Sequence, residues 1–223
     1  MPKREIVTVN NLTDELLFRK IVVIIRGIEK RHLEALCEAL YAGGIRFVEY
    51  TYNVFSDSET AKSIEFMNER FSDKMFVGAG TVLNTEQVRL TKKVGGKFII
   101  SPNFDSTVIE ETKKSGLLSM PAAVTPTEIC EAYKAGADII KLFPAATLGP
   151  EYLKAVTAPL NNIPIMAVGG INVANIPAFL KAGAKGFGIG SDIVRKDLIE
   201  NADYKEISRI AKEFTTAVNT KND

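Results

Sequence analysis

Short apolar runs alternate with amphipathic stretches along the whole chain. The runs are rich in Val, Ile, Leu and Phe, which is typical of strands that are buried on both faces of a parallel sheet. Eight strands are predicted on this basis, at 21–25, 46–51, 75–79, 97–101, 117–120, 138–143, 163–168 and 185–189. The stretches between them carry apolar residues at helical spacing, so a strand–helix unit repeats along the sequence.

Start and stop signals frame the predicted helices. Gly43-Gly44 ends the first helix after a strand, and the same glycine-then-strand joint recurs in AGADIIKLF and AGAKGFGIG. Asn84–Gln87 and Thr125–Glu128 have the spacing of capping boxes at helix starts. A short helix at about 12–18 is predicted to plug the bottom of the fold, and the last outer helix is predicted at about 203–218.

Eight strand–helix units in 223 residues predict one α/β domain, a (β/α)8 TIM barrel that spans residues 1–223. The alternative is an open doubly wound sheet, which usually has fewer strands and a glycine fingerprint after the first one. The loop after the first strand here is Arg26-Gly27-Ile28-Glu29, which lacks that fingerprint. The barrel predicts that chemistry lies at the carboxyl ends of the strands.

The charge balance narrows the classes of partner. Lys and Arg number 28 against 27 Asp and Glu, and no basic block stands out, so we expect neither nucleic acid nor an anionic membrane surface as partner. No apolar run has the length of a membrane span, and the N-terminus lacks the apolar core of a signal peptide. A cytoplasmic protein is the expectation.

Few residues are suited to metal or imidazole chemistry. His32 is the single histidine and is expected to be a solvated residue at a helix start, so neither a hydrolytic triad nor a multi-histidine zinc site is predicted. Cys37 and Cys130 fall in predicted helices without metal-ligand spacing. Reduced core thiols are favoured over a disulfide.

Lys141 lies in the middle of the sixth predicted strand, ADIIKLFPA. A buried ammonium group is costly, and lysine commonly avoids that cost through a lowered pKa, which makes it a nucleophile for carbonyl carbon. The alternative is a lysine whose stem packs in the barrel while its head reaches water. Alternation places Glu49 on one face of the second strand, so both side chains meet in the barrel mouth if both faces point inward. A structural ion pair is the alternative for that pair.

Two glycine turns suggest a phosphate site. Gly169-Gly170 follows the seventh strand and Gly190-Ser191 follows the eighth. Backbone N–H groups in these two positions bind phosphate in many barrels, although ordinary turn glycines are the alternative.

The set VEYT, GAGTV, ISPN, IIKLFPA, VGGI and GIGS resembles the 2-keto-3-deoxy-6-phosphogluconate (KDPG)/4-hydroxy-2-oxoglutarate (KHG) aldolase family, from about residue 21 to about 217. The resemblance implies a class I aldolase that works without metal or other cofactor, is typically a homotrimer, and cleaves a 2-oxo acid, commonly phosphorylated, to pyruvate and an aldehyde. It implies that Lys141 forms the Schiff base and that Glu49 is the general acid/base. The implied substrate-binding residues are Thr81 and Pro102 for the pyruvate half, Phe143 in the pocket wall, and Gly169, Gly170, Gly190 and Ser191 for phosphate.

Three positions depart from the family pattern. Asn53 stands where many members have a carboxylate-binding arginine, and Arg26 at the end of the first strand is the candidate replacement. Val168 replaces a threonine and Ala122 a glycine, both expected near the distal part of the substrate. From the resemblance, KDPG or KHG is the first expected substrate. The alternatives are an aldolase for 2-keto-3-deoxy-6-phosphogalactonate and a non-aldolase phosphate-binding barrel.

Overall fold

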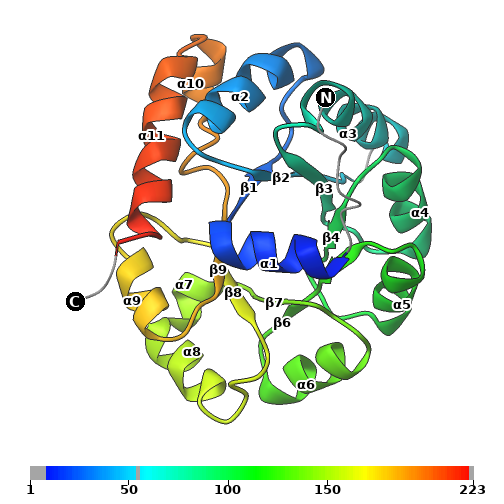
Figure 1. Ribbon diagram of the computed structural model, residues 1–223, viewed down its shortest axis with the longest axis vertical. Helices are drawn as coiled ribbons and strands as arrows, with labels where there is room; N and C mark the ends of the chain where they lie inside the picture. Colours follow the sequence, from blue (N-terminus) through cyan, green and yellow to red (C-terminus); the bar gives the residue numbers. More distant parts are fainter. Residues whose placement is uncertain (1–8, 54–55, 221–223) are drawn as a thin grey trace.

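The computed structural model describes residues 9–53 and 56–220 and shows a parallel barrel surrounded by helices (Figure 1). The strands are β1 Ile21–Ile25, β2 Phe47–Thr51, β3 Phe76–Gly80, β4 Phe98–Ile100, β5 Leu118–Met120, β6 Ala122–Ala123, β7 Ile140–Leu142, β8 Ile165–Val168 and β9 Gly186–Ile189. The helices are α1 Val9–Arg19, α2 Lys30–Ala42, α3 Asp57–Phe71, α4 Thr85–Lys93, α5 Ser106–Lys114, α6 Pro126–Lys134, α7 Ala145–Leu148, α8 Pro150–Thr157, α9 Ile176–Lys181, α10 Lys196–Glu200 and α11 Tyr204–Ala217.

The strand order is β5-β4-β3-β2-β1-β9-β8-β7-β6, and every pairing is parallel. The predicted fifth strand divides into β5 and β6 around Pro121, because proline has no N–H to give to a ladder. β5 pairs with β4 and β6 pairs with β7, and the Lys141 N–H donates to the Pro121 carbonyl at 2.9 Å. The predicted barrel is confirmed, and its ends meet at this proline.

Strand and helix ends follow from local chemistry. The predicted strand 138–143 shortens to β7; the Asp138 and Ile139 N–H groups both donate to the Ser119 carbonyl, and the Asp138 carboxylate accepts from Lys113 Nζ and from the Ser119 N–H. The Thr125 capping box is complete at the start of α6. At α4 Asn84 caps the helix, but Gln87 accepts from the Leu83 N–H, so the reciprocal half of that predicted box is absent.

Two sequence expectations about single residues need correction. His32 is half-buried rather than solvated, because its Nδ1 lies 3.0 Å from the Tyr204 hydroxyl of α11. Both cysteines are unpaired, yet only Cys37 is a core thiol, since Cys130 is half-buried on α6.

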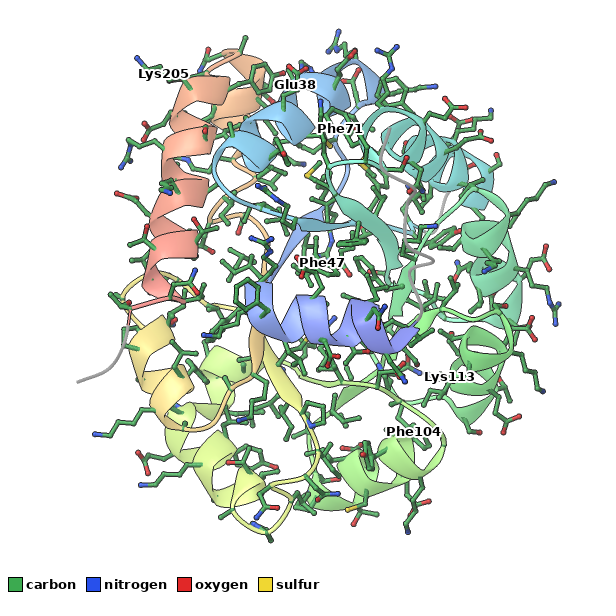
Figure 2. All side chains as sticks on the ribbon, in the orientation of Figure 1. Glu38, Phe47, Phe71, Phe104, Lys113 and Lys205 are labelled. Carbon is green, nitrogen blue, oxygen red and sulfur yellow. The ribbon has the colours of Figure 1, made fainter. Side chains whose placement is uncertain are left out.

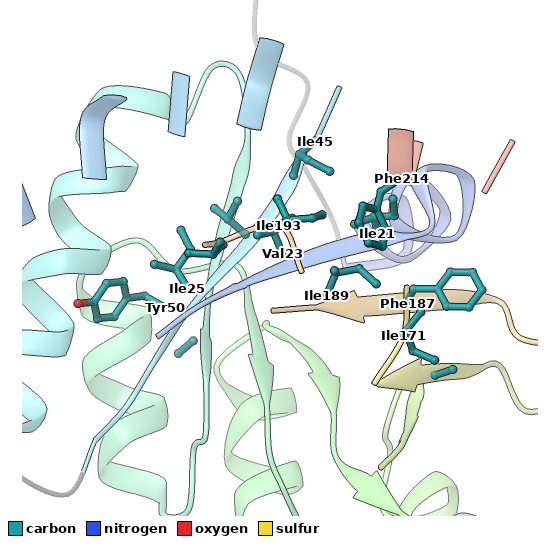
Figure 3. Packing of buried hydrophobic residues seen from close by; sticks show 14 of the residues in the cluster. Ile21, Val23, Ile25, Ile45, Tyr50, Ile171, Phe187, Ile189, Ile193 and Phe214 are labelled. Carbon is teal, nitrogen blue, oxygen red and sulfur yellow. The ribbon is translucent and has the colours of Figure 1, made fainter. Parts of the chain in front are cut away.

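The barrel interior and the space under the outer helices form two apolar cores. α1 crosses the amino end of the barrel (Figure 1), and its Leu12 and Leu16 join the interior core with Phe47 and Phe98. Figure 2 shows Phe47 beside α1. The other core lies between strands and helices, with Ile21 of β1 beside Phe214 of α11 (Figure 3). α1 covers the amino end of the barrel interior, in the region where the sequence predicts a short helix at about 12–18.

Among the described residues, no helix has both the length and the apolar character that crossing a membrane requires.

Candidate functional site

A cavity of about 860 Å³ opens at the carboxyl end of the barrel. It is lined by every residue that the sequence nominated for catalysis or binding: Arg26, Glu49, Thr81, Pro102, Lys141, Phe143, Gly169, Gly170, Gly190 and Ser191. They come from the ends of seven different strands or from the turns that follow them. The strand-end rule of parallel barrels thus brings together residues that are far apart in the sequence.

Lys141 sits on β7 with only 7% of its surface exposed. Burial lowers the pKa of its ammonium group below the usual value, Arg26 acts in the same direction, and the Glu49 carboxylate opposes them. Its Nζ lies 5.0 Å from the centroid of the Phe143 ring, two residues further along the same face. A lysine with this lowered pKa reaches its neutral, nucleophilic form more readily.

Glu49 faces the same cavity from β2 and is 2% exposed. Burial raises the pKa of this carboxyl to about 7, against the opposing attraction of Lys141 and Arg26. Its Oε2 is buried and has no hydrogen-bond partner. Within residues 9–53 and 56–220 no ion pair joins Glu49 to Lys141. A buried carboxyl and a buried amine that line one cavity, each with a pKa shifted by burial toward its neutral form, are typical of a candidate acid–base site.

The glycines of the GAGTV motif make room for these groups. A Cβ on Gly80 would lie 2.5 Å from the Glu49 carboxyl carbon, and a Cβ on Gly78 would lie 2.4 Å from the Phe98 ring. Thr81 follows with φ of 58°, a left-handed conformation that is strained for a β-branched residue. Strain of this kind is frequent at ligand sites, and here it falls on a residue that lines the cavity.

The two glycine turns form another wall. Gly169 and Gly170 have φ of 94° and 71°, and a Cβ on Gly170 would lie 2.6 Å from the Ala146 Cβ. The Gly169 carbonyl accepts from the Ala146 N–H at 3.0 Å, and the Gly170 carbonyl accepts from Asn175 Nδ2 at 2.9 Å. These carbonyl oxygens are therefore engaged by groups on α7 and just before α9.

The departures from the family pattern have different places. Val168 is buried at the end of β8 and lines the cavity. Ala122 is not among the lining residues; it is buried in β6 in register with Lys141, so its expected place near the distal substrate is not where the structure puts it. Asn53 is also outside the lining and accepts from the Ser56 N–H through Oδ1 at 3.1 Å.

Sequence reasoning missed a charged group after β9. Asp192, Arg195, Lys196 and Asp197 also line the cavity. They lie in the turn beyond the strand end, and the strand-end rule considers only residues at the end itself. The only signal for their place in the site was their closeness to Gly190-Ser191 in the sequence.

The candidate site contains no set of metal ligands. No group of three or more His, Cys, Asp or Glu side chains capable of holding a metal ion occurs in the described parts of the chain.

Comparisons with known proteins agree on one family. A family model described as KDPG and KHG aldolase matches residues 12–210. The chain is 33% identical to the 2-dehydro-3-deoxy-6-phosphogalactonate aldolase of Escherichia coli (strain K12), over 89% of this chain and 96% of that protein. It is 35% identical to the probable 2-dehydro-3-deoxy-6-phosphogalactonate aldolase of Rhizobium meliloti (strain 1021), over 79% of this chain and 82% of the relative.

A solved structure agrees as well. The KDPG aldolase of Legionella pneumophila, with pyruvate captured as a covalent carbinolamine, superposes with a TM-score of 0.82 at 27% identity, covering 92% of this chain and 97% of the other. The family match, the relatives and the shared fold together show that this chain belongs to the KDPG and KHG aldolase family of class I aldolases.

Proposed function

We propose that this protein cleaves 2-dehydro-3-deoxy-6-phosphogalactonate (2-dehydro and 2-keto name the same group) to pyruvate and glyceraldehyde 3-phosphate. Lys141 is the imine-forming lysine and Glu49 the general acid/base. The observation that carries the proposal is the buried, unpaired combination of these two groups in one cavity: a lysine with a lowered pKa and a carboxyl with a pKa of about 7.

The reaction begins at the substrate's keto carbon. The lone pair of neutral Lys141 attacks C2, and the carbinolamine loses its oxygen as water to give an iminium ion. Glu49, directly or through a water, takes the proton of the C4 hydroxyl. The C4 oxygen then forms a carbonyl, the C3–C4 bond breaks, and its electron pair becomes the enamine double bond as the iminium nitrogen loses its positive charge.

Glu49 also completes the cycle. Its protonated form returns the proton to C3, and water then hydrolyses the new iminium ion to pyruvate and free Lys141. A pKa of about 7 suits a group that must accept and then return a proton near neutral pH. Such general acid–base help typically contributes about 10²- to 10⁴-fold in rate.

The other lining residues bind the two ends of the substrate. Arg26 supplies the guanidinium for the carboxylate, in place of the arginine that the chain lacks at Asn53, and its charge acts on both Lys141 and Glu49. Thr81 and Pro102 contact the pyruvate half and Phe143 covers it. Gly169, Gly170, Gly190 and Ser191 hold the phosphate at the opposite wall.

The choice of the galacto substrate over KDPG or KHG rests on two observations. The phosphogalactonate aldolases match at 33% and 35% identity, above the 27% of the KDPG aldolase from Legionella. Val168 also puts an apolar side chain in the cavity wall where a threonine would offer a hydroxyl. KDPG differs from the galacto substrate in the direction of the C4 hydroxyl, and KHG differs in chain length, so the wall that faces those groups determines the specificity.

Borohydride trapping with pyruvate tests the chemistry. We expect a covalent pyruvate adduct on the wild type, mapped by mass spectrometry to Lys141, and no adduct on Lys141→Ala. Lys97→Ala is the control, because Lys97 is an exposed lysine just before β4, at the opposite end of the barrel. A non-aldolase phosphate-binding barrel would give no adduct in any variant, and an adduct that persists in Lys141→Ala would disprove the assigned lysine.

Turnover of a substrate panel tests the specificity. We expect kcat/KM for 2-dehydro-3-deoxy-6-phosphogalactonate to exceed that for KDPG and for KHG. A higher kcat/KM for KDPG or for KHG would instead make that compound the preferred substrate of this site.

A further inference from the structure

The turn after β9 carries charged side chains that the proposed chemistry does not use. Arg195, Lys196 and Asp197 line the same cavity as Lys141, beyond Gly190 and Ser191. In the sequence they follow the Gly190-Ser191 turn directly.

Arg195 is paired with a neighbouring carboxylate in the same cavity. Its Nε donates to Asp197 Oδ1 at 3.2 Å and its Nη2 donates to Oδ2 of the same carboxylate. The two side chains are 48% and 58% exposed, so this rim pair is open to solvent and to a ligand. An exposed pair of this kind contributes little to stability and can exchange partners at low cost.

The backbone beneath the rim pair is fixed. The Ile193 and Val194 N–H groups both donate to the Gly190 carbonyl, at 3.1 and 2.9 Å, and both side chains are buried. Arg195 therefore starts from a rigid turn, and only its flexible side chain can move between Asp197 and the cavity.

Arg26 and Arg195 have different electrostatic partners. Arg26 acts on the pKa of both Lys141 and Glu49. Arg195 is not among the charges that shift these two pKa values and acts instead on Asp197 and Glu206, so it lies farther from the reacting groups than Arg26. A phosphorylated 2-oxo acid carries its carboxylate next to the reacting carbon and its phosphate at the opposite end, which matches this separation.

We propose that Arg195 selects phosphorylated substrates by leaving Asp197 and binding the substrate phosphate next to Gly190 and Ser191. The inference rests on the proposed function and adds a specificity-determining side chain to it. The planar guanidinium fork fits a phosphate as well as a carboxylate, and the dianion attracts it more strongly than the single charge of Asp197. Asp197 keeps the fork oriented while the cavity is empty and competes with weaker anions, so an unphosphorylated 2-oxo acid gains nothing from Arg195.

The test compares a phosphorylated substrate with its unphosphorylated counterpart. In Arg195→Gln we expect KM for 2-dehydro-3-deoxy-6-phosphogalactonate to rise about 10- to 100-fold, the range for losing a charged hydrogen-bonding group, with kcat retained. Both kcat and KM for 2-dehydro-3-deoxygalactonate should stay at the wild-type values. Asp197→Asn, which frees the fork, should lower KM for the phosphorylated substrate only.

Arg209→Gln is the matched control. Arg209 is an exposed arginine that pairs with Glu206 and Glu213 of its own helix, and it lies outside the cavity. It should leave the kinetics of both substrates unchanged. An Arg195→Gln variant that affects both substrates equally, or neither, would overturn the inference.

Two readouts separate this inference from the proposed function. Pyruvate trapping should persist in Arg195→Gln, because the rim pair does not touch the reacting lysine. Inorganic phosphate should raise the thermal midpoint of the wild type and raise it less in Arg195→Gln. Loss of trapping in the wild type would refute the aldolase proposal, whereas an undiminished phosphate effect in Arg195→Gln would refute only the role of Arg195.

Discussion

The two ends of the barrel interior are built from the same strands, but one end is a packed apolar layer and the other lines the candidate site. Along β2 the inward side chains run from Phe47 to Glu49, and the matching pair at β7 is Ile139, just before the strand, and Lys141 within it. The first member of each pair belongs to the interior core under α1, and the second lines the cavity. One pleat repeat, about 6–7 Å, separates a packed layer from a reactive one.

This difference shows how the fold tolerates a costly site. The lower layer stabilises the barrel through burial of large apolar side chains, several of them with no exposed surface. The upper layer contains two buried ionisable groups, and burial shifts the pKa of each so that its neutral form is favoured. The desolvation that causes these shifts opposes the stability of the fold. Changes at the two ends should therefore have separable effects on folding and on chemistry.

The largest effect on stability should come from the lower layer. Phe98 is fully buried and its ring fills the space that Gly78 leaves, so Phe98→Ala should lower the free energy of unfolding by about 3–5 kcal/mol. Chemical denaturation measures this change. The surviving folded fraction should still trap pyruvate at Lys141, and Lys141→Met should do the reverse, losing trapping without losing stability.

The stability of Glu49→Gln relative to wild type should depend on pH, and this dependence tests whether the upper layer opposes folding. Because burial raises the pKa of Glu49 from 4.5 to about 7, the folded state binds more protons than the unfolded state between these values, and wild-type stability falls as pH rises through that window. The shift corresponds to a loss on the order of 3 kcal/mol, complete above pH 7. Glu49→Gln lacks this loss, so its unfolding free energy relative to wild type should increase by that amount from pH 4.5 to pH 8.

Kinetics provide the second half of the Glu49 experiment. Turnover of Glu49→Gln should fall by about 10²- to 10⁴-fold while the pyruvate adduct still forms on Lys141. A stability difference that does not change with pH would contradict the buried, shifted carboxyl. Wild-type turnover in the variant would contradict its role in proton transfer.

Arg26→Ala should have a smaller effect, felt on both binding and proton transfer. We expect KM for the 2-oxo acid to rise about 10- to 100-fold through loss of the carboxylate's guanidinium. The pKa of Glu49 should also move further up, because Arg26 is one of the charges that lowers it. A pH–rate profile checks that direction, and an unchanged KM would exclude Arg26 as the replacement for the arginine missing at Asn53.

The sequence predicted the barrel and the polar strand-end residues because strand ends converge in a parallel barrel and can be recognised from apolar runs followed by polar residues. The binding roles of Thr81, Pro102 and Phe143 came from the family resemblance, and all three line the cavity. Arg195 and Asp197 were not predicted as site residues, because they lie in a turn beyond a strand. In a turn, no periodicity of the sequence indicates which way a side chain points. The position of Ala122 was also not predicted, because Pro121 divides its strand and sets a register with β7 that the sequence does not show.

Val168→Thr should have the smallest effect and concerns the specificity of the upper layer. Val168 packs against the space left by Gly188, where a Cβ would lie 2.8 Å from its Cγ2, so the new hydroxyl has little freedom except toward the cavity. The galacto and gluco substrates differ in the direction of the C4 hydroxyl, and one new hydrogen bond is worth about 0.5–1.5 kcal/mol. The ratio of kcat/KM for the galacto substrate over KDPG should therefore fall by about 2- to 10-fold. Val194→Thr makes the same substitution in another wall of the cavity and should leave the ratio unchanged. If both variants shift the ratio equally, the change in specificity comes from a general loosening of the cavity, and the wall at Val168 does not discriminate between the two epimers.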